Sequence, residues 1–275
     1  MHLLLKRLAT LLLLTTLLVL AGCTSISLAY NQLPRLAAWW VDGYLDLDRS
    51  QRRKLDEQLV VWQTWHRQEE LPQWIALVQQ AEAGLREGLT TDALLALEQA
   101  GRESAERCLQ RAAPLAAPLL ASLRPAQWQH MQQKLKDSLK EWREAQSGPD
   151  GASERADQYA QTLSRWLGDL DRSTRRQARA EAQSWQPDVA VLAAARAERH
   201  ARTIEALRAW SRQDLADGTA LLMRNTYPQP TEMPFRLTVM ASMLKLLNQL
   251  SPAERARVQS HWAGWEADLR ALRPR

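Results

Sequence analysis

The sequence has few glycines, few prolines and almost no cysteine: its 275 residues include 10 Gly, 12 Pro and 2 Cys. Folds rich in strands and turns use more glycine and proline, so this composition argues against an all-β or loop-rich fold. No run alternates apolar and polar residues for long enough to predict a strand. With 45% apolar and 24% charged residues, the chain has the composition of a globular protein rather than a disordered one.

The sequence also lacks the common catalytic and metal-binding motifs. It has no Gly-rich phosphate loop, no His-Glu-x-x-His and no serine elbow, so we expect no catalytic residues, no metal and no cofactor. His66 with Glu69 and Glu70 is the nearest approach to a helical metal-ligand pair, and we interpret it as an exposed polar cluster at a helix end. Asp48 lies in an acidic segment that only distantly resembles a calcium loop, and it fits a helix cap better.

The first 22 residues have the features of a secretory signal peptide. Lys6-Arg7 precede an apolar run from Leu8 to Leu20 that is too short to span a bilayer. The next residues, Leu20-Ala21-Gly22-Cys23, resemble the bacterial lipobox. This resemblance implies that Cys23 carries a diacylglycerol and an acylated amino group, and that the protein lies on the periplasmic face of the outer membrane, because Thr24 is not the aspartate of an inner-membrane retention signal. An ordinary signal peptide followed by a chance cysteine is the alternative.

The remainder of the chain has the periodicity of helices. Apolar residues recur every three or four positions, as in Trp128, Met131, Leu135, Leu139 and Trp142. Such stripes need partners, so the sequence predicts an all-α fold, an antiparallel multi-helix bundle that follows the signal peptide.

Prolines interrupt two of the predicted helical regions. Pro114 and Pro118 should kink or end the helix that carries Cys108, which we interpret as a small buried residue. The proline-rich segment 227–234 should not be helical until after Pro234.

Four predicted helix starts share a leucine followed by capping residues. Ser251-Pro252-Ala253-Glu254 is a capping box with a favourable proline, and Asp48 with Gln51 is another. Similar starts follow Leu123 and Leu170. The best break in the chain is the linker 147–152, which separates an N-terminal half, 23–146, from a C-terminal half, 153–275; one continuous domain over 30–272 is the alternative. The recurring starts hint at a duplicated half, although chance repetition of helix-start chemistry explains them more simply.

Tryptophan is unusually abundant, with 12 residues against 5 Phe and Tyr together. Trp39 and Trp40 are adjacent, so on a helix their side chains diverge by about 100°. Four interpretations of this pair are open: a membrane-interface anchor, a glycan-stacking platform, a docking patch for a protein, or a contact that packs the N-terminal segment onto the bundle. Together with Asp42, Tyr44 and Asp46 they form a candidate interaction segment.

Basic residues are concentrated in the C-terminal half. The candidate interaction residues there are Arg172, Arg175, Arg176, Arg179 and Arg199. Arginine binds carboxylates and phosphates through two parallel hydrogen bonds, which would suit peptidoglycan, lipid phosphates or acidic proteins. We expect no nucleic acid partner outside the cytoplasm. A solvated face with nearby acids is the alternative.

Residues 30–34, Tyr-Asn-Gln-Leu-Pro, and residues 39–48, Trp-Trp-Val-Asp-Gly-Tyr-Leu-Asp-Leu-Asp, resemble the opening of an uncharacterised family of Gram-negative lipoproteins. The resemblance implies a lipoprotein with a helical remainder and no known activity. The starts at Leu123 and Leu250 are similar to the Leu-Thr-x-x-Gln motif of small periplasmic stress chaperones, with Arg124 and Ser251 in place of threonine.

We therefore expect a non-enzymatic envelope interaction protein. Its partners would be the membrane, through the lipid on Cys23, and an envelope protein or peptidoglycan; the oligomeric state stays open. A periplasmic chaperone or envelope-stress sensor is the alternative. An enzyme acting on glycan or lipid through acids such as Asp42 and Asp46 is a third hypothesis.

Overall fold

The computed structural model describes residues 25–274, and its regular secondary structure within this range is entirely helical. This confirms the predicted all-α bundle. The signal peptide and Cys23 lie outside the described residues. The helices are α2 (Ser25–Asn31), α3 (Leu33–Leu45), α4 (Arg49–Trp65), the π-helical turn η1 (His66–Glu70), α5 (Leu71–Glu87), α6 (Thr91–Ala121), α7 (Pro125–Ser147), α8 (Gly151–Leu167), α9 (Arg172–Gln183), α10 (Val189–Ser211), α11 (Leu215–Arg224), the 3₁₀ turn η2 (Pro230–Glu232), α12 (Met233–Gln249) and α13 (Pro252–Leu272).

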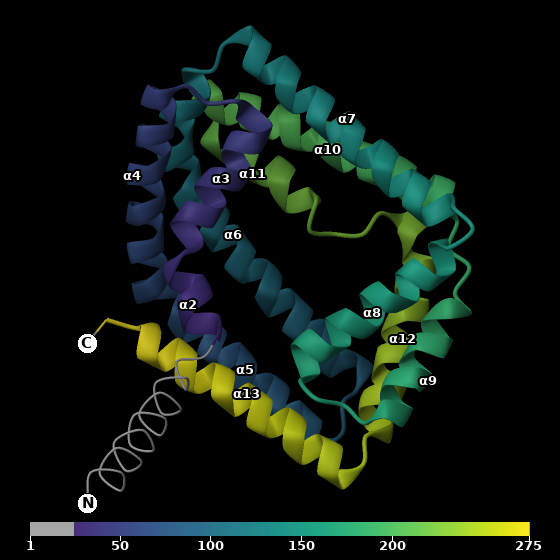
Figure 1. The fold of residues 1–275 in the computed structure, drawn as a ribbon. Coiled ribbons are helices and arrows are strands. Elements are labelled where there is room, and N and C mark those ends of the chain that lie inside the picture. The colour runs from purple at the N-terminus through teal and green to yellow at the C-terminus, as the bar shows by residue number, and fades with distance from the viewer. Residues whose placement is uncertain (1–24, 275) are drawn as a thin grey trace, which may run out of the picture.

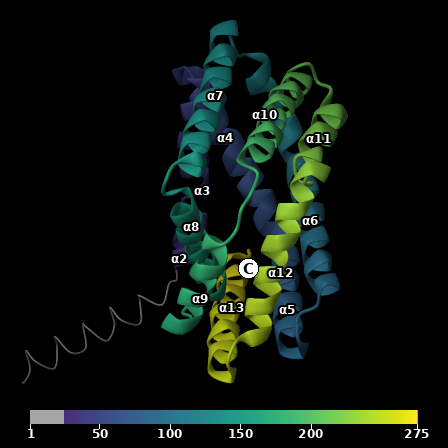
Figure 2. The ribbon, with the colours of Figure 1, turned by 90° about the vertical axis from the view of Figure 1, so that its right-hand side faces the viewer.

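The helices are arranged as a closed frame. In Figure 1, α4 forms one side, α7 and α10 run side by side along the next, α8, α9 and α12 lie opposite α4, and α5 and α13 close the frame. Helix α6 crosses behind the middle. Figure 2 shows the same helices from the side. The last helix, α13, packs against α2 near the start of the described chain.

No helix between residues 25 and 274 combines the length and the apolar character needed to cross a membrane.

Two groups of helices surround two main cores. The hollow group, named for the cavity described below, consists of α3, α4, α6, α7, α10 and α11, and its core includes Leu45, Leu47, Leu120, Met131 and Trp210. The filled group consists of α5, α8, α9, α12 and α13, and its core contains the buried residues Leu85, Leu89, Leu163, Leu167, Leu170, Ala178, Leu246, Leu247, Leu250, Val258 and Trp262. Each group takes helices from both sides of the segment 148–150, so the two sequence halves do not have separate cores.

Helices from each half pack into the group formed mainly by the other: α5 lies in the filled group, and α10 and α11 lie in the hollow group. Helix α5, from the N-terminal half, packs along α13, the last helix of the C-terminal half. Helix α10, from the C-terminal half, packs along α7, the last helix of the N-terminal half. This packing is reciprocal, which explains why both cores contain residues from both halves.

Two helix starts meet in the hollow group and form a junction of neutral amides. Asp48 caps α4 in a capping box with Gln51, as predicted. Gln127, the third residue of α7, donates to the Leu45 and Asp46 carbonyls at 3.1 and 2.9 Å and to Gln51 Oε1 at 2.8 Å. Gln127 and Gln51 are both buried. The junction therefore fastens the start of α7 to the turn between α3 and α4.

The filled group contains the corresponding junction, built on a carboxylate. Ser251 caps α13 in the predicted capping box with Glu254. Glu254 Oε1 accepts from Thr174 Oγ1 at 2.6 Å and from the Asp171 backbone N–H at 3.1 Å, which joins α13 to the start of α9. These hydrogen bonds lower the pKa of Glu254 to about 2, although burial opposes the shift. In both junctions the third residues of two helices touch.

Prolines lie inside one helix and in the first turn of another. Of the two outcomes predicted for Pro114 and Pro118, a kink or an end of the helix, the end was wrong, because α6 continues through both residues to Ala121. Both prolines are exposed, so water can satisfy the carbonyl oxygens that lose a helical N–H partner. Helix α12 begins at Met233, one residue before Pro234, because proline is tolerated in a first helical turn.

Candidate functional site

A large apolar cavity lies inside the hollow group. Its volume is about 830 Å³, within the range of roughly 300–1,000 Å³ that is typical of small-molecule pockets. All six helices of the group contribute to its wall. The lining residues are Leu33, Pro34, Ala37, Trp40, Val41, Tyr44, Leu45, Leu55, Gln58, Leu59, Trp62, Gln63, Leu109, Ala112, Leu115, Ala116, Leu119, Leu120, Met131, Leu135, Ser138, Arg196, His200, Thr203, Leu207, Trp210 and Leu222.

Small side chains on α6 help to leave this space open. Ala112 and Ala116 line the cavity one helical turn apart, and Ala113 and Ala117 of the same stretch are fully buried in the adjoining core. Because methyl groups reach only a short way from the backbone, this part of α6 cannot fill the space between α4 and α10. The Ala/Pro-rich stretch 112–118 thus forms a thin wall.

The two adjacent tryptophans have different positions relative to the cavity. Trp40 lines it, is 59% exposed and packs against Tyr44 with 4.8 Å between ring centroids. Trp39 is 76% exposed and does not belong to the lining. Neither residue packs the N-terminal segment into the core, so that interpretation was wrong. Trp40 and Tyr44 stand at the boundary between the cavity and solvent.

The predicted acidic residues of this segment shape the backbone. Asp42 accepts from the Leu47 N–H at 3.0 Å and pairs with Arg52 at 2.8 Å, which holds the turn between α3 and α4. Asp46 ends α3 in the left-handed region with φ 46°, and its carbonyl accepts from Gln127. Asp42 and Asp46 thus fix the end of α3 and, through it, Trp40 and Tyr44.

The polar residues Arg196 and His200 line one part of the apolar wall. Arg196 also lines a second cavity of about 360 Å³, together with Trp142, Arg199, Tyr227 and Arg236. The two cavities therefore meet at the Arg196 side chain. The second cavity has a mixed lining, about equally polar and apolar, that includes three arginines, whereas the first is almost entirely apolar.

Arg196 differs from the arginines around it because it has no carboxylate partner among the described residues. Its guanidinium carbon lies 5.6 Å from the centroid of the Trp142 ring, and its buried Nε has no hydrogen-bond partner within residues 25–274. Arg199 binds Glu232 at 2.6 Å, and Arg236 pairs with Glu98. Burial, Arg196 and Arg199 all lower the pKa of His200, so its imidazole is neutral at pH 7.

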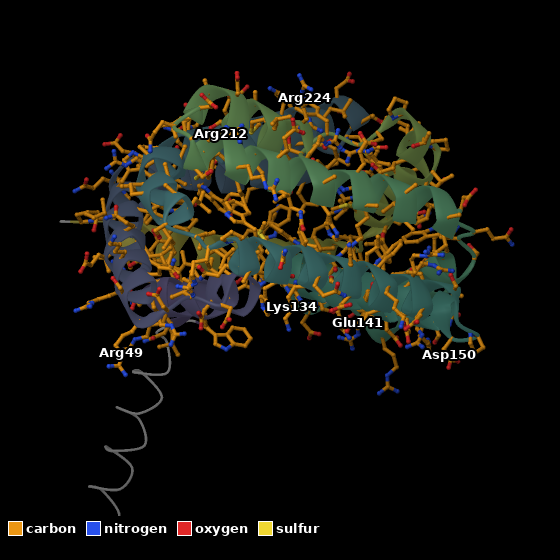
Figure 3. All side chains as sticks on the ribbon, turned by 90° about the horizontal axis from the view of Figure 1, so that it is seen from above. Arg49, Lys134, Glu141, Asp150, Arg212 and Arg224 are labelled. Carbon is orange, nitrogen blue, oxygen red and sulfur yellow. The ribbon has the colours of Figure 1, made fainter. Side chains whose placement is uncertain are left out.

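The charged surface outside the cavities is solvated. Figure 3 shows the side chains of Lys134, Glu141 and Arg224 directed away from the space between α7 and α10. On α9, Arg175 pairs with Asp169 and Arg179 pairs with Asp157, and Arg172 and Arg176 are also exposed. Arg199 lies on α10 at the second cavity, so the structure does not bring it together with the four arginines of α9. A binding role for that arginine face stays a prediction.

A second buried polar cluster lies at η1, where the sequence suggested an exposed helix end. That expectation was wrong for His66 and Glu70, which are both buried in the π-helical turn, whereas Glu69 is exposed as expected. Tyr30 Oη lies 2.8 Å from His66 Nδ1, and burial lowers the pKa of His66 and raises that of Tyr30 to about 12. Glu70 binds Arg107 at 2.6 Å.

The donors near η1 are therefore used within the protein. Within residues 25–274 no group of three or more His, Cys, Asp or Glu side chains is arranged to hold a metal ion. Cys108 is half-buried, and burial raises its pKa to about 11, which suits an inert thiol.

Sequence reasoning missed the cavity and the role of Arg196 in its wall. Periodicity identifies which residues face inward but not whether their volumes fill the interior. The available signal was the alanine-rich stretch 112–118, which contrasts with the leucine-rich stretches elsewhere.

Comparison with known protein families identifies a match that covers most of the chain. A family model described as a family of unknown function (DUF6279) matches residues 43–226, which is more than half of the chain. The match includes α4, α6, α7, α10 and α11 of the hollow group and ends before α12 and α13. No curated protein and no solved structure matches the chain.

Proposed function

We propose that this chain, which belongs to the family of unknown function DUF6279, is a lipid-anchored, non-enzymatic envelope protein. In this proposal it takes up an apolar guest in the cavity of the hollow group. The anchor would be the acylated Cys23, which would hold the helices at the periplasmic face of the outer membrane.

The observation that carries the proposal is the apolar cavity of about 830 Å³. Most proteins fill their interiors at close to crystalline density, and a void of this size removes packing contacts from every side chain that lines it. An apolar guest would restore those contacts and bury apolar surface, at about 25 cal/mol per Å². A site for an apolar guest explains why the chain keeps the space.

The rim supplies a route for such a guest. Trp40 is exposed to solvent on one side and lines the cavity on the other, and it lies against Tyr44. Aromatic rings that contact water on one side and apolar groups on the other are typical of sites where an apolar molecule passes from a membrane or a carrier into a protein. The segment that the sequence marked as an interaction site would then act as the entrance.

In-cell photo-crosslinking tests the proposal. Benzoylphenylalanine would replace Leu135 in the cavity wall, Trp40 at the rim, or Trp39, the matched control that is exposed but outside the lining. Mass spectrometry would then give the mass of each adduct. We expect adducts of lipid mass at Leu135 and Trp40 and none at Trp39. Adducts confined to the chain itself at all three positions would contradict the proposal.

A second candidate function is docking of a protein, for a chaperone or a stress sensor. Leu36, Trp39 and Trp40 are all more than half exposed and recur at three- and four-residue spacing on α3, which makes an apolar stripe on the outer surface. Protein-sized adducts at both Trp39 and Trp40, without a lipid adduct at Leu135, would favour this function over guest uptake.

A further inference from the structure

We infer that the guest is an anionic amphiphile, with its apolar chain in the large cavity and its carboxylate or phosphate headgroup on Arg196. This inference rests on the proposed uptake of an apolar guest and adds the chemistry of its polar end. Three observations support it: Arg196 lines both cavities, its Nε–H has no hydrogen-bond acceptor among the described residues, and the neighbouring arginines have carboxylate partners.

The position of Arg196 joins two environments. The side chain lines both the apolar cavity and the arginine-containing cavity of about 360 Å³. A molecule that fills the first cavity and extends past Arg196 therefore enters a space bordered by arginines. At Arg196 the lining changes from apolar to arginine-containing, which matches the apolar chain and the anionic headgroup of a charged lipid.

The guanidinium of Arg196 has unused hydrogen-bonding capacity. The side chain is half-buried, but its Nε–H is fully buried, and a buried donor without an acceptor is costly. Trp142 offers Arg196 only the face of its ring, and Nε has no hydrogen-bond acceptor among the described residues. A carboxylate or phosphate could accept two parallel hydrogen bonds from the guanidinium, which is the geometry that arginine favours.

Among the described arginines that line the two cavities, Arg196 is the one without a carboxylate partner. Arg199 pairs with Glu232, and Arg236 shares Glu98 with Arg102. His200, one turn along α10, is neutral at pH 7 and does not compete for the anion. A neutral lipid would leave the guanidinium of Arg196 without a partner, so the site should discriminate between charged and uncharged headgroups.

Fluorescence quenching by a brominated lipid provides the test. Trp40, Trp62 and Trp210 line the cavity, so 9,10-dibromostearate should quench their emission when it binds. Its methyl ester has the same chain without the charge. The full chain would be kept in a non-ionic amphipol, and both compounds would be titrated into the wild type and into three variants: Arg196→Ala, Arg196→Lys and Arg208→Ala.

Arg208→Ala is the matched control. Arg208 also lies on α10 with its guanidinium carbon 5.5 Å from a tryptophan ring, that of Trp128, but it belongs to neither cavity. We expect Arg196→Ala to weaken binding of the acid roughly 10- to 100-fold, the range for a hydrogen-bonded charge, and to leave ester binding unchanged. Arg196→Lys should lose less, because it keeps the charge, and Arg208→Ala should match the wild type.

Three other outcomes would contradict one or both proposals. Equal binding of acid and ester by the wild type, unaffected by Arg196→Ala, would overturn the inference and leave apolar uptake standing. A similar loss in Arg208→Ala would also overturn it, because the effect would not be specific to the cavity. Quenching by neither compound would overturn uptake itself.

Competition distinguishes the two sources of the anion. Stearate and a single-chain lipid phosphate would each be used to displace dibromostearate from the wild type. Stronger displacement by either compound identifies the headgroup and supports the inference. Equally effective displacement by stearyl alcohol, which has no charge, would overturn it.

Discussion

The hollow and filled groups use similar junctions and similar helices, yet one encloses a cavity of about 830 Å³ and the other a cavity of only about 10 Å³. Corresponding stretches help to explain the difference. Leu119-Leu120, Leu123 and Pro125, where α6 gives way to α7, are each repeated 127 positions later by Leu246-Leu247, Leu250 and Pro252, where α12 gives way to α13.

The same offset identifies wall residues of the hollow group that have smaller side chains than the aligned residues of the filled group. It aligns Ala116, in the cavity wall, with Met243, which packs on the filled core. It also aligns Leu135, another wall residue, with the buried Trp262. At both positions the hollow group has the smaller side chain. The offset also aligns the wall residues Met131 and Leu115 with the smaller Val258 and Ser242, so side-chain size at single positions contributes to the difference but does not account for all of it.

The first way to test this comparison is to shorten a leucine in each group. Leu167→Ala, at a position 1% exposed in the filled core, should destabilise the protein by about 3–4 kcal/mol, because it opens a new void. Leu135→Ala should cost about 1 kcal/mol, because that side chain already borders empty space. Urea unfolding of the two variants measures the loss in the free energy of unfolding for each. Equal losses would mean that the cavity is filled by the protein's own side chains in solution.

The second test exchanges the chemistry of the two junctions. Gln127→Glu places a buried carboxylate against the Leu45 and Asp46 carbonyls, so we expect a loss of about 3 kcal/mol. Glu254→Gln keeps one carbonyl oxygen for Thr174 and Asp171 and should cost about 1 kcal/mol. Urea unfolding measures the loss in the free energy of unfolding for both variants. A smaller loss for Gln127→Glu than for Glu254→Gln would show that the junctions tolerate either chemistry.

The third test uses acid, which should weaken the filled-group junction through the buried Glu254 more than the hollow-group junction, whose carboxylate is the exposed cap Asp48. The pKa of Glu254 falls from 4.5 in an unfolded chain to about 2 in the folded one. Its contribution to stability is therefore complete above pH 4.5 and is lost as the pH falls towards 2, by an amount on the order of 3 kcal/mol. Unfolding free energies measured from pH 5 to pH 2 should show this loss in the wild type and in Gln127→Ala, and a smaller loss in Glu254→Gln.

The smallest expected effect comes from copying one residue between the groups. Ala116→Met gives the hollow group the side chain that Met243 provides in the filled group, and it should stabilise the empty protein by about 1 kcal/mol. It should also reduce quenching by dibromostearate. The reciprocal variant, Met243→Ala, should destabilise without changing quenching. Destabilisation by Ala116→Met would show that the cavity cannot accept added volume without strain.

Sequence reasoning predicted the helical class and the caps because both depend on local patterns. The capping boxes at Asp48 and Ser251 are present as predicted. Reasoning failed where contacts between distant segments decide the result. His66 and Glu70 were expected to be exposed, but Tyr30, Trp62 and Arg107 surround them. The sequence alone does not indicate that these segments meet.

The candidate site was predicted only in part. The sequence singled out Trp40 and Tyr44, which line the cavity, but it grouped them with Trp39, which does not. It noted arginines on α9 that are exposed to solvent, and it did not distinguish Arg196 from the paired arginines beside it. Pairing and cavity volume depend on tertiary structure, so neither can be read from spacing along one helix.

The packing of α5 against α13 determines when folding can finish. Leu71 and Ile75 of α5 form a core with Leu269 and Leu272 of α13, so α5 needs residues that lie about 200 positions later in the sequence. A chain synthesised in sequence order therefore exposes Leu71 and Ile75 until α13 has been made. Such distant contacts slow folding and favour a single late step over growth from the N-terminus.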